Sequence, residues 1–157
     1  MNPSSIVTLL HWSVPACFGL HIIEELFWPG GFREWYHGYR PQVAGATMGY
    51  YYKANAVYFT ATLLTAFGGP ASMLFAAGVL FNNLLFTHVK GTLATRKYSP
   101  GIVTGALLYV PMFASCYGYV LTQHLMSLPL ALSCYALSFS SEIYFALKKV
   151  APTAKAA

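Results

Sequence analysis

Long apolar stretches separated by short polar connections make up most of this chain. A helix needs about 20 mostly apolar residues to cross the ~30 Å hydrocarbon layer of a bilayer. Five stretches suit such helices: residues 5–28, 50–67, 70–90, 101–123 and 128–147. Gly68-Gly69-Pro70 and Ser99-Pro100-Gly101 are typical breakers between helices. The pattern predicts an all-α integral membrane bundle of five transmembrane helices, in a single domain over residues 1–157.

The composition agrees with a membrane protein and excludes several other classes. Hydrophobic residues make up 57% of the chain and charged residues 8%, whereas soluble domains carry roughly 25% charged residues. The three cysteines all lie within apolar stretches, which excludes a disulfide scaffold. A glycine-rich phosphate loop is absent, so we expect no nucleotide cofactor.

The nine basic residues predict an orientation in the membrane. With five spans they all fall on one side: in the first connection and the start of the second span, in the third connection, and in the tail. The positive-inside rule makes that side cytoplasmic, with the N-terminus outside and the C-terminus inside the cell (inner) membrane. Topology therefore explains the net charge of +5, and we expect no nucleic-acid partner. The basic residues are Arg33, Arg40, Lys53, Lys90, Arg96, Lys97, Lys148, Lys149 and Lys155.

The first connection also mixes aromatic and charged residues. Residues 32–40 read Phe-Arg-Glu-Trp-Tyr-His-Gly-Tyr-Arg. Such a mixture is typical of a segment that lies in the membrane interface.

The densest polar group inside a predicted span is His21-Ile22-Ile23-Glu24-Glu25. Ionisable residues at membrane depth cost about 2.5–3.5 kcal/mol each on insertion scales, so they indicate a functional site. At roughly 100° per residue, Glu24 and Glu25 lie about 60° and 40° from His21, on opposite sides of it. The three side chains therefore share one helix face. Two adjacent carboxylates repel each other unless one is protonated or a cation compensates them.

Other polar residues are predicted at the same depth, in the cytoplasmic leaflet. Asn83 and His88 lie toward the inner end of span 70–90, and Glu142 lies at the inner end of span 128–147. Asn83 and His88 are five residues apart, which places them about 140° apart on a regular α-helix. Either a local bulge realigns them, or Asn83 has a role other than supporting His88.

Several motifs of this chain occur together in one known family. His21-x-x-Glu24-Glu25 is followed by Trp28-Pro29-Gly30-Gly31-Phe32, and Asn83 and His88 precede Arg96-Lys97-Tyr98-Ser99-Pro100-Gly101. With these motifs, residues 11–125 resemble the family of small integral membrane proteins named for its His-x-x-Glu-Glu (HXXEE) motif. The function of that family is largely unassigned, and the resemblance implies a membrane protein suspected of enzyme activity. The resemblance also implies an Asn and a His about one turn apart, from which the spacing of Asn83 and His88 departs.

A metal site is the first functional hypothesis. Imidazole and carboxylate ligands suit Zn, Fe or Mn, and di-iron carboxylate bundles place Glu and His one turn apart on facing helices. A divalent cation would also compensate the adjacent carboxylates. One position would stay open for water or oxygen. The expected metal ligands are His21, Glu24, Glu25, His88 and Glu142, and the expected catalytic residues are Glu24, Glu25, His21 and Asn83.

The sequence thus predicts a membrane-embedded His/Glu enzyme, metal-dependent, that acts on a small hydrophobic or lipid-like substrate from the cytoplasmic leaflet. One alternative is a metal-free acid–base enzyme, namely a hydrolase, isomerase or cyclase, in which a buried Glu is the acid and its neighbour or His21 the base. A second alternative is a non-enzymatic membrane carrier or scaffold. The expected partners are the lipid bilayer and the substrate, and a homodimer would suit so small a bundle.

Overall fold

The computed structural model describes residues 3–27, 29 and 31–147, and this part of the chain folds into helices joined by short turns. The first half contains α1 (Pro3–Ile22), which continues as the π-helix η1 (Ile23–Phe27), then α2 (Phe32–Tyr39), the 3-10 turn η2 (Pro41–Val43) and α3 (Met48–Thr65). The second half begins with α4 (Pro70–Asn83), which continues as the π-helix η3 (Leu84–Val89) and α5 (Lys90–Thr95). It ends with α6 (Ile102–Thr104), the π-helix η4 (Gly105–Tyr109) and α7 (Val110–Thr122), followed by α8 (Leu128–Ser138) and α9 (Ser140–Leu147).

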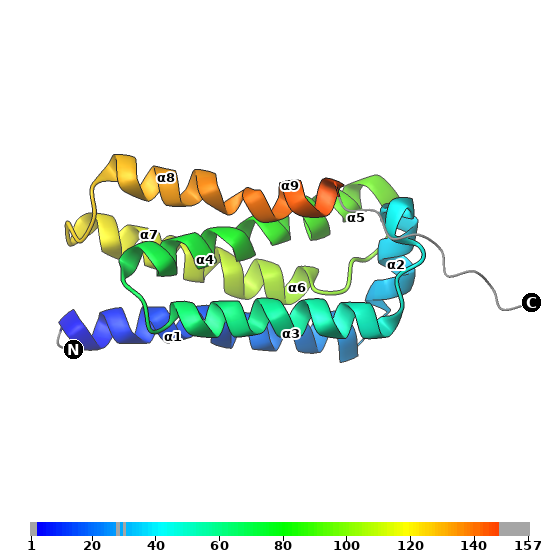
Figure 1. Cartoon of the computed structure of the whole chain (residues 1–157), viewed down its shortest axis with the longest axis horizontal. Helices are drawn as coiled ribbons and strands as arrows, with labels where there is room; N and C mark the ends of the chain where they lie inside the picture. The colour runs from blue at the N-terminus through cyan, green and yellow to red at the C-terminus, as the bar shows by residue number, and fades with distance from the viewer. Residues whose placement is uncertain (1–2, 28, 30, 148–157) are drawn as a thin grey trace, which may run out of the picture.

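Some of these helices follow one another directly or after a single residue, and we call each such run a rod. The described residues form six rods, whereas the sequence predicts five helices. Five rods lie side by side, and α2 lies across one end of the bundle (Figure 1). The additional helix is the segment predicted to lie in the interface. Phe32, Trp35 and Tyr36 are buried on one face of α2, while Arg33 and Glu34 are not. Trp28, Lys148, Lys149 and Lys155, which the sequence places at span ends or in the tail, lie outside the described residues.

Three described segments are long and apolar enough to cross a membrane: Ser5–Phe27, Pro70–Thr95 and Ile102–Thr122. They correspond to the predicted spans 5–28, 70–90 and 101–123. The predicted spans 50–67 and 128–147 are not among them. The start of α3 carries Lys53 and Asn55, and Phe139 divides the last rod into α8 and α9.

The core lies around α4, which packs against α1, α3, α7 and α8. Met73, Leu74 and Leu80 of α4 are almost completely buried. A Cβ added at Gly78 would lie 2.7 Å from Ser138 Oγ, so α4 and α8 approach closely, as small residues allow in membrane helices. Asn82 Nδ2 donates a 2.8 Å hydrogen bond to the same Ser138 hydroxyl. This packing holds α4 and its continuation, η3, in place against the other rods.

Candidate functional site

Three of the rods contain a π-helical turn, and each turn carries a polar residue of one buried cluster. Glu24 and Glu25 lie in η1, His88 lies in η3, and Tyr109 ends η4. A π-turn inserts an extra residue and turns the following side chains to new directions, and such turns are frequent at functional sites. His21, His88 and Tyr109 have no exposed surface at all.

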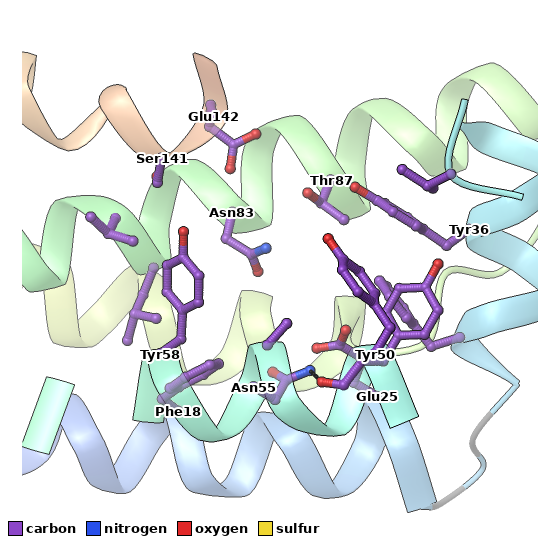
Figure 2. Close-up of a pocket in the computed structure, with 16 residues that line it drawn as sticks. Phe18, Glu25, Tyr36, Tyr50, Asn55, Tyr58, Asn83, Thr87, Ser141 and Glu142 are labelled. Atoms are coloured by element: carbon purple, nitrogen blue, oxygen red, sulfur yellow. Dashed lines mark hydrogen bonds between the residues drawn. The ribbon is translucent and has the colours of Figure 1, made fainter. Parts of the chain in front are cut away.

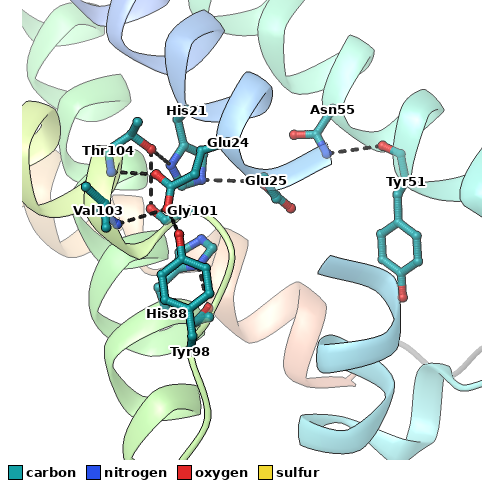
Figure 3. Close-up of polar contacts among 11 residues, drawn as sticks. His21, Glu24, Glu25, Tyr51, Asn55, His88, Tyr98, Gly101, Val103 and Thr104 are labelled. Atoms are coloured by element: carbon teal, nitrogen blue, oxygen red, sulfur yellow. Dashed lines mark hydrogen bonds and ion pairs between the residues drawn. The ribbon is translucent and has the colours of Figure 1, made fainter. Parts of the chain in front are cut away.

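His21, Glu25 and His88 form the centre of this cluster, which we call the His–Glu–His group (Figure 3). His21 Nε2 lies 3.3 Å from Glu25 Oε2. The His21 and His88 rings meet edge to face, with centroids 4.9 Å apart. One ligand atom from each of the three residues lies within 4.8 Å of the other two. Segments far apart in the sequence thus bring two imidazoles and one carboxylate to a common point.

Hydroxyl groups hold both imidazoles by Nδ1. His21 Nδ1 lies 3.1 Å from Thr104 Oγ1, and His88 Nδ1 lies 2.9 Å from Ser99 Oγ. In the tautomer that carries its proton on Nδ1, His21 donates to the Thr104 hydroxyl, which lies 3.4 Å from the carbonyl oxygen of Gly101. The lone pair of His21 then lies on Nε2, which faces Glu25.

The Nε2 atoms are the unusual feature of the group. Neither His21 Nε2 nor His88 Nε2 has a hydrogen-bond partner of good geometry among the described residues, although His21 Nε2 lies close to Glu25. Buried polar atoms in proteins are nearly always paired. Two buried imidazole nitrogens beside a buried carboxylate therefore make a donor set that suits a cation or a shared proton.

Glu24 points to different partners from those of Glu25. Its Oε1 accepts hydrogen bonds from the Tyr98 hydroxyl and from the Val103 N–H, and its Oε2 accepts a 2.6 Å bond from the Thr104 N–H (Figure 3). These two N–H groups belong to the first turn of α6, where a negative charge is stabilising. Burial and the hydrogen bond to Glu24 raise the pKa of Tyr98 to about 12, so its hydroxyl remains a donor. Glu24 thus ties η1 to α6 and positions the group.

The turn Tyr98-Ser99-Pro100-Gly101 completes this support. Tyr98 binds Glu24, Ser99 contacts His88, and Gly101 packs against both imidazoles. Gly101 has φ +98°, and a Cβ at this position would lie 2.7 Å from Cε1 of His21 and from Cε1 of His88. Only glycine combines that backbone conformation with so close an approach.

Helix α2 covers the His88 side of the group with aromatic rings. The Trp35 ring stacks on His88 with an interplanar angle of 7° and a centroid distance of 6.2 Å. Trp35 Nε1 donates to Thr95 Oγ1 at 3.2 Å, and a Cβ at Gly91 would lie 2.5 Å from the indole. The close packing of α2 on α5 shields His88 from solvent at this end of the bundle.

A cavity of ≈ 80 Å³ opens beside Glu25, between α1, α3, α4 and α9 (Figure 2). Asn83, Asn55 and Glu142 also line it. Glu142 lies 3.8 Å from Arg40, measured between Oε2 and Nη2. The cavity has room for several water molecules. Glu25 therefore belongs both to the His–Glu–His group and to the wall of a polar cavity.

The structure brings together only part of the predicted site. His21, Glu25 and His88 meet, whereas the carboxylate of Glu24 is directed to α6 and that of Glu142 lines the cavity. A π-helical turn, η3, lies between Asn83 and His88, which agrees with the local bulge considered from the sequence. The two side chains nevertheless have different surroundings. Asn83 lines the cavity, and His88 meets His21 and Ser99.

The other three histidines lie apart from the group. His11 Nδ1 lies 3.3 Å from the carbonyl oxygen of Ala66 near the opposite end of α1. His124 follows α7 with φ 52°. His37 lies in α2, where burial and the nearby Arg33 lower its pKa.

Sequence reasoning missed Thr104, Ser99, Trp35 and Tyr109 as parts of the site. The Tyr98-Ser99-Pro100-Gly101 motif was a signal for Ser99, and the interfacial pattern was one for Trp35. Nothing local marks Thr104 or Tyr109, because both lie in an ordinary apolar span. The Tyr109 ring lies 4.8 Å from His21, and its buried hydroxyl has no hydrogen-bond partner among the described residues.

Comparison with known proteins supports the resemblance noted in the sequence. A family described as "Protein of unknown function with HXXEE motif" matches residues 12–116, which include every residue of the His–Glu–His group but not Glu142. The "Uncharacterized protein YrkK" of Bacillus subtilis (strain 168) is 31% identical over 107 residues, which are 61% of this chain and 66% of the relative. The match thus spans slightly less than two thirds of that relative's length. No solved structure matches this chain.

Proposed function

The chain belongs to the HXXEE family, and from that premise we propose that it is a membrane-embedded, metal-dependent enzyme that acts on a small hydrophobic or lipid-like substrate. The observation that carries this proposal is the convergence of three groups beside a cavity: one carboxylate and two imidazole nitrogens that have no hydrogen-bond partner among the described residues. His21, Glu25 and His88 would hold the metal. Glu24 would position them, and Asn83 would orient the substrate from the cavity wall.

One pair of atoms in the group has the spacing of two ligands on a divalent cation. Two ligands about 2.1 Å from a tetrahedral ion lie roughly 3.4 Å apart, and His21 Nε2 and Glu25 Oε2 are 3.3 Å apart. The hydroxyl contacts of Nδ1 would fix the orientation of both rings, as the outer hydrogen-bond partners of metal-bound histidines do. Two imidazoles and one carboxylate suit Fe, Zn or Mn.

Three protein ligands leave a coordination position for water or substrate, and a bound metal would supply Lewis-acid chemistry there. Glu25 also lines the cavity from which a substrate would approach. Its carboxylate can accept or return a proton while the Trp35 and Tyr109 rings exclude bulk water from the imidazoles. Glu142, with Arg40, would act at the cavity wall and not as a ligand.

The contact of His21 with Glu25 also supports a second candidate function, a metal-free acid–base enzyme. A proton shared across 3.3 Å would satisfy His21 Nε2 without a metal. Glu25 would then be the acid, and His21 the base, for a hydrophobic substrate in the same cavity.

Elemental analysis of the detergent-purified protein tests the metal. We expect near-stoichiometric Zn, Fe or Mn in the wild type and at least a tenfold loss in His88→Ala, because one of three ligands is removed. His11→Ala is the matched control, since His11 is also buried but lies outside the group, and it should keep its metal. A wild type that stays metal-free after supplementation with each ion would support the acid–base enzyme instead.

We also propose the topology that the basic residues predict: five spans in the cell (inner) membrane, the N-terminus outside and the C-terminus cytoplasmic. The structure supports this arrangement because α2, α5 and the connection to α6, which carry Arg33, Arg40, Lys90, Arg96 and Lys97, lie at one end of the bundle (Figure 1). The His–Glu–His group would then lie in the cytoplasmic leaflet. A homodimer remains part of the proposal, to be read from the mass of the purified protein in detergent.

Reporter fusions check the topology. Alkaline phosphatase, which is active only outside the cytoplasm, should be active when fused after Met126 and inactive when fused after Lys97. A fluorescent protein that folds only in the cytoplasm should fluoresce at the C-terminus. Phosphatase activity after Lys97 would contradict the five-span arrangement.

A further inference from the structure

An open groove runs from the cavity along the seam between α3 and α9. Helix α3 packs against α1 and α4, while α9 packs against α4 and α8, so α4 forms the floor between them. Two further hollows adjoin the cavity along this seam and share Tyr58 with it. We call this feature the α3–α9 groove; it is lined by Tyr58 and Ala61 of α3, Ala76 and Val79 of α4, and Ser141 and Tyr144 of α9.

The groove has the dimensions of one lipid chain. The floor of the groove and the cavity together extends from Ala76 to Thr87, which is roughly 16 Å along a helix at 1.5 Å per residue. This length is about half of the ~30 Å hydrocarbon layer. Small side chains at Ala61 and Ala76 leave room in the groove. In the proposed topology α3 and α9 both span the membrane, so the groove between them would open toward the acyl chains of the bilayer.

The end of the groove at the cavity offers both a hydrogen-bond donor and an acceptor. Among the described residues, Asn83 Oδ1 and the Tyr51 hydroxyl are buried without a partner, and both residues line the cavity. In the described part of the chain, its charged lining residues are two carboxylates, Glu25 and Glu142, and no Lys, Arg or His lines it. Arg40 compensates Glu142 from outside the lining, and the ion of the proposed function would compensate Glu25.

We propose that the ligand of this site is a single-chain lipid alcohol, with its tail in the α3–α9 groove and its hydroxyl in the cavity beside Asn83 and Glu25. This inference rests on the proposed function for its chemistry, but it concerns binding alone. A hydroxyl both donates and accepts, so it satisfies Asn83 Oδ1 and the Tyr51 hydroxyl together. A fatty acid, as a carboxylate, has no proton to donate to Asn83 Oδ1, and an ammonium group cannot accept the proton of Tyr51.

Photolabelling in nanodiscs of zwitterionic phospholipid tests the proposal. The probes are hexadecanol, hexadecanoic acid and hexadecylamine, each with a diazirine at the middle of the chain. We expect the alcohol to label peptides of α3 and α9, at least about tenfold more than the acid does, because a carboxylate leaves the buried Asn83 Oδ1 without a donor. Mass spectrometry of the digested protein locates the labelled peptides.

Two variants on the same helix separate the groove from the general lipid surface. Ala61→Trp fills the groove and should reduce labelling by the alcohol at least about tenfold. Ala56→Trp adds the same ring to an exposed position of α3 that lines none of the three hollows, and labelling should be unchanged. Both variants must elute as the wild type does and keep its metal content.

Each other outcome would overturn the proposal. Equal labelling by the three probes would show that the groove holds only surrounding lipid, and a preference for the amine or the acid would exclude the alcohol. Labelling that Ala61→Trp leaves unchanged would exclude the groove. The metal content of the same samples is measured separately, so a failed labelling result with metal present rejects the ligand, and a metal-free protein that labels as expected rejects the metal.

Discussion

Replacing Gly101 with alanine should disrupt the His–Glu–His group and abolish metal binding. The added Cβ would lie 2.7 Å from a carbon of each imidazole. Tyr109 and Trp35 pack against these rings, so neither ring has free space to move into. The backbone at φ +98° adds strain, and strain and overpacking together cost roughly 2–5 kcal/mol. We expect a lower thermal unfolding midpoint in detergent and a metal-free protein.

Gly31→Ala is the matched control for this prediction. Gly31 also has a positive φ of +82°, but a Cβ there would meet nothing within 4 Å. This variant therefore carries the backbone strain without the contact to the imidazoles, and it should lose only about 1 kcal/mol and keep its metal. Equal effects of the two substitutions would mean that the Gly101 contact with His21 and His88 does not matter.

Glu24→Gln and Glu25→Gln should change different properties of the protein, although the two residues are adjacent: the first should lower its stability, and the second should remove its metal or its activity. Glu24 accepts three hydrogen bonds at the start of α6 with its two oxygens. A glutamine keeps one oxygen, turns an NH₂ group toward a donor and removes the charge, which costs roughly 2–4 kcal/mol of stability. Glu25 contributes one oxygen near His21, so Glu25→Gln should preserve the stability of the metal-free protein and lose the metal or the activity.

Thermal unfolding and elemental analysis on the same preparations separate the two roles. With unfolding midpoints compared between metal-free samples, the expected pattern is a lower midpoint for Glu24→Gln and an unchanged midpoint for Glu25→Gln, whose metal content as purified is close to zero. The assignment of Glu24 as a positioning residue fails if Glu24→Gln loses its metal without a lower unfolding midpoint. The assignment of Glu25 fails if it retains the full metal content.

Part of the site could be predicted from the sequence because the cost of burying charge is a local property. His21, Glu24 and Glu25 stand out in an apolar stretch whatever the fold, and so do Asn83 and His88. Their directions could not be predicted in the same way. A regular helix places Glu24 and Glu25 on one face with His21, but the π-turn at Ile23–Phe27 and the partners in α6 separate them.

The same reasoning applies to Asn83 and His88, because the sequence does not determine the relative direction of their side chains. A π-helix closes its hydrogen bonds over five residues and an α-helix over four, and no residue type in Leu84–Val89 indicates the change. The wider hydrogen bonding is stable here because η3 packs against α6 and η4. Such packing involves residues that are distant in the chain.

The sequence by itself determined that the chain is helical and apolar, that residues 32–40 suit the membrane interface rather than a span, and that His and Glu side chains lie within apolar segments. Hydropathy, charge and helix breakers act segment by segment, so they can be read without the fold. Only the tertiary structure decided which carboxylate meets the imidazoles. That choice depends on Tyr98, 74 residues from Glu24, and on Thr104, 83 residues from His21. A side chain is directed by the partners that pack around it, and these come together only when the helices do.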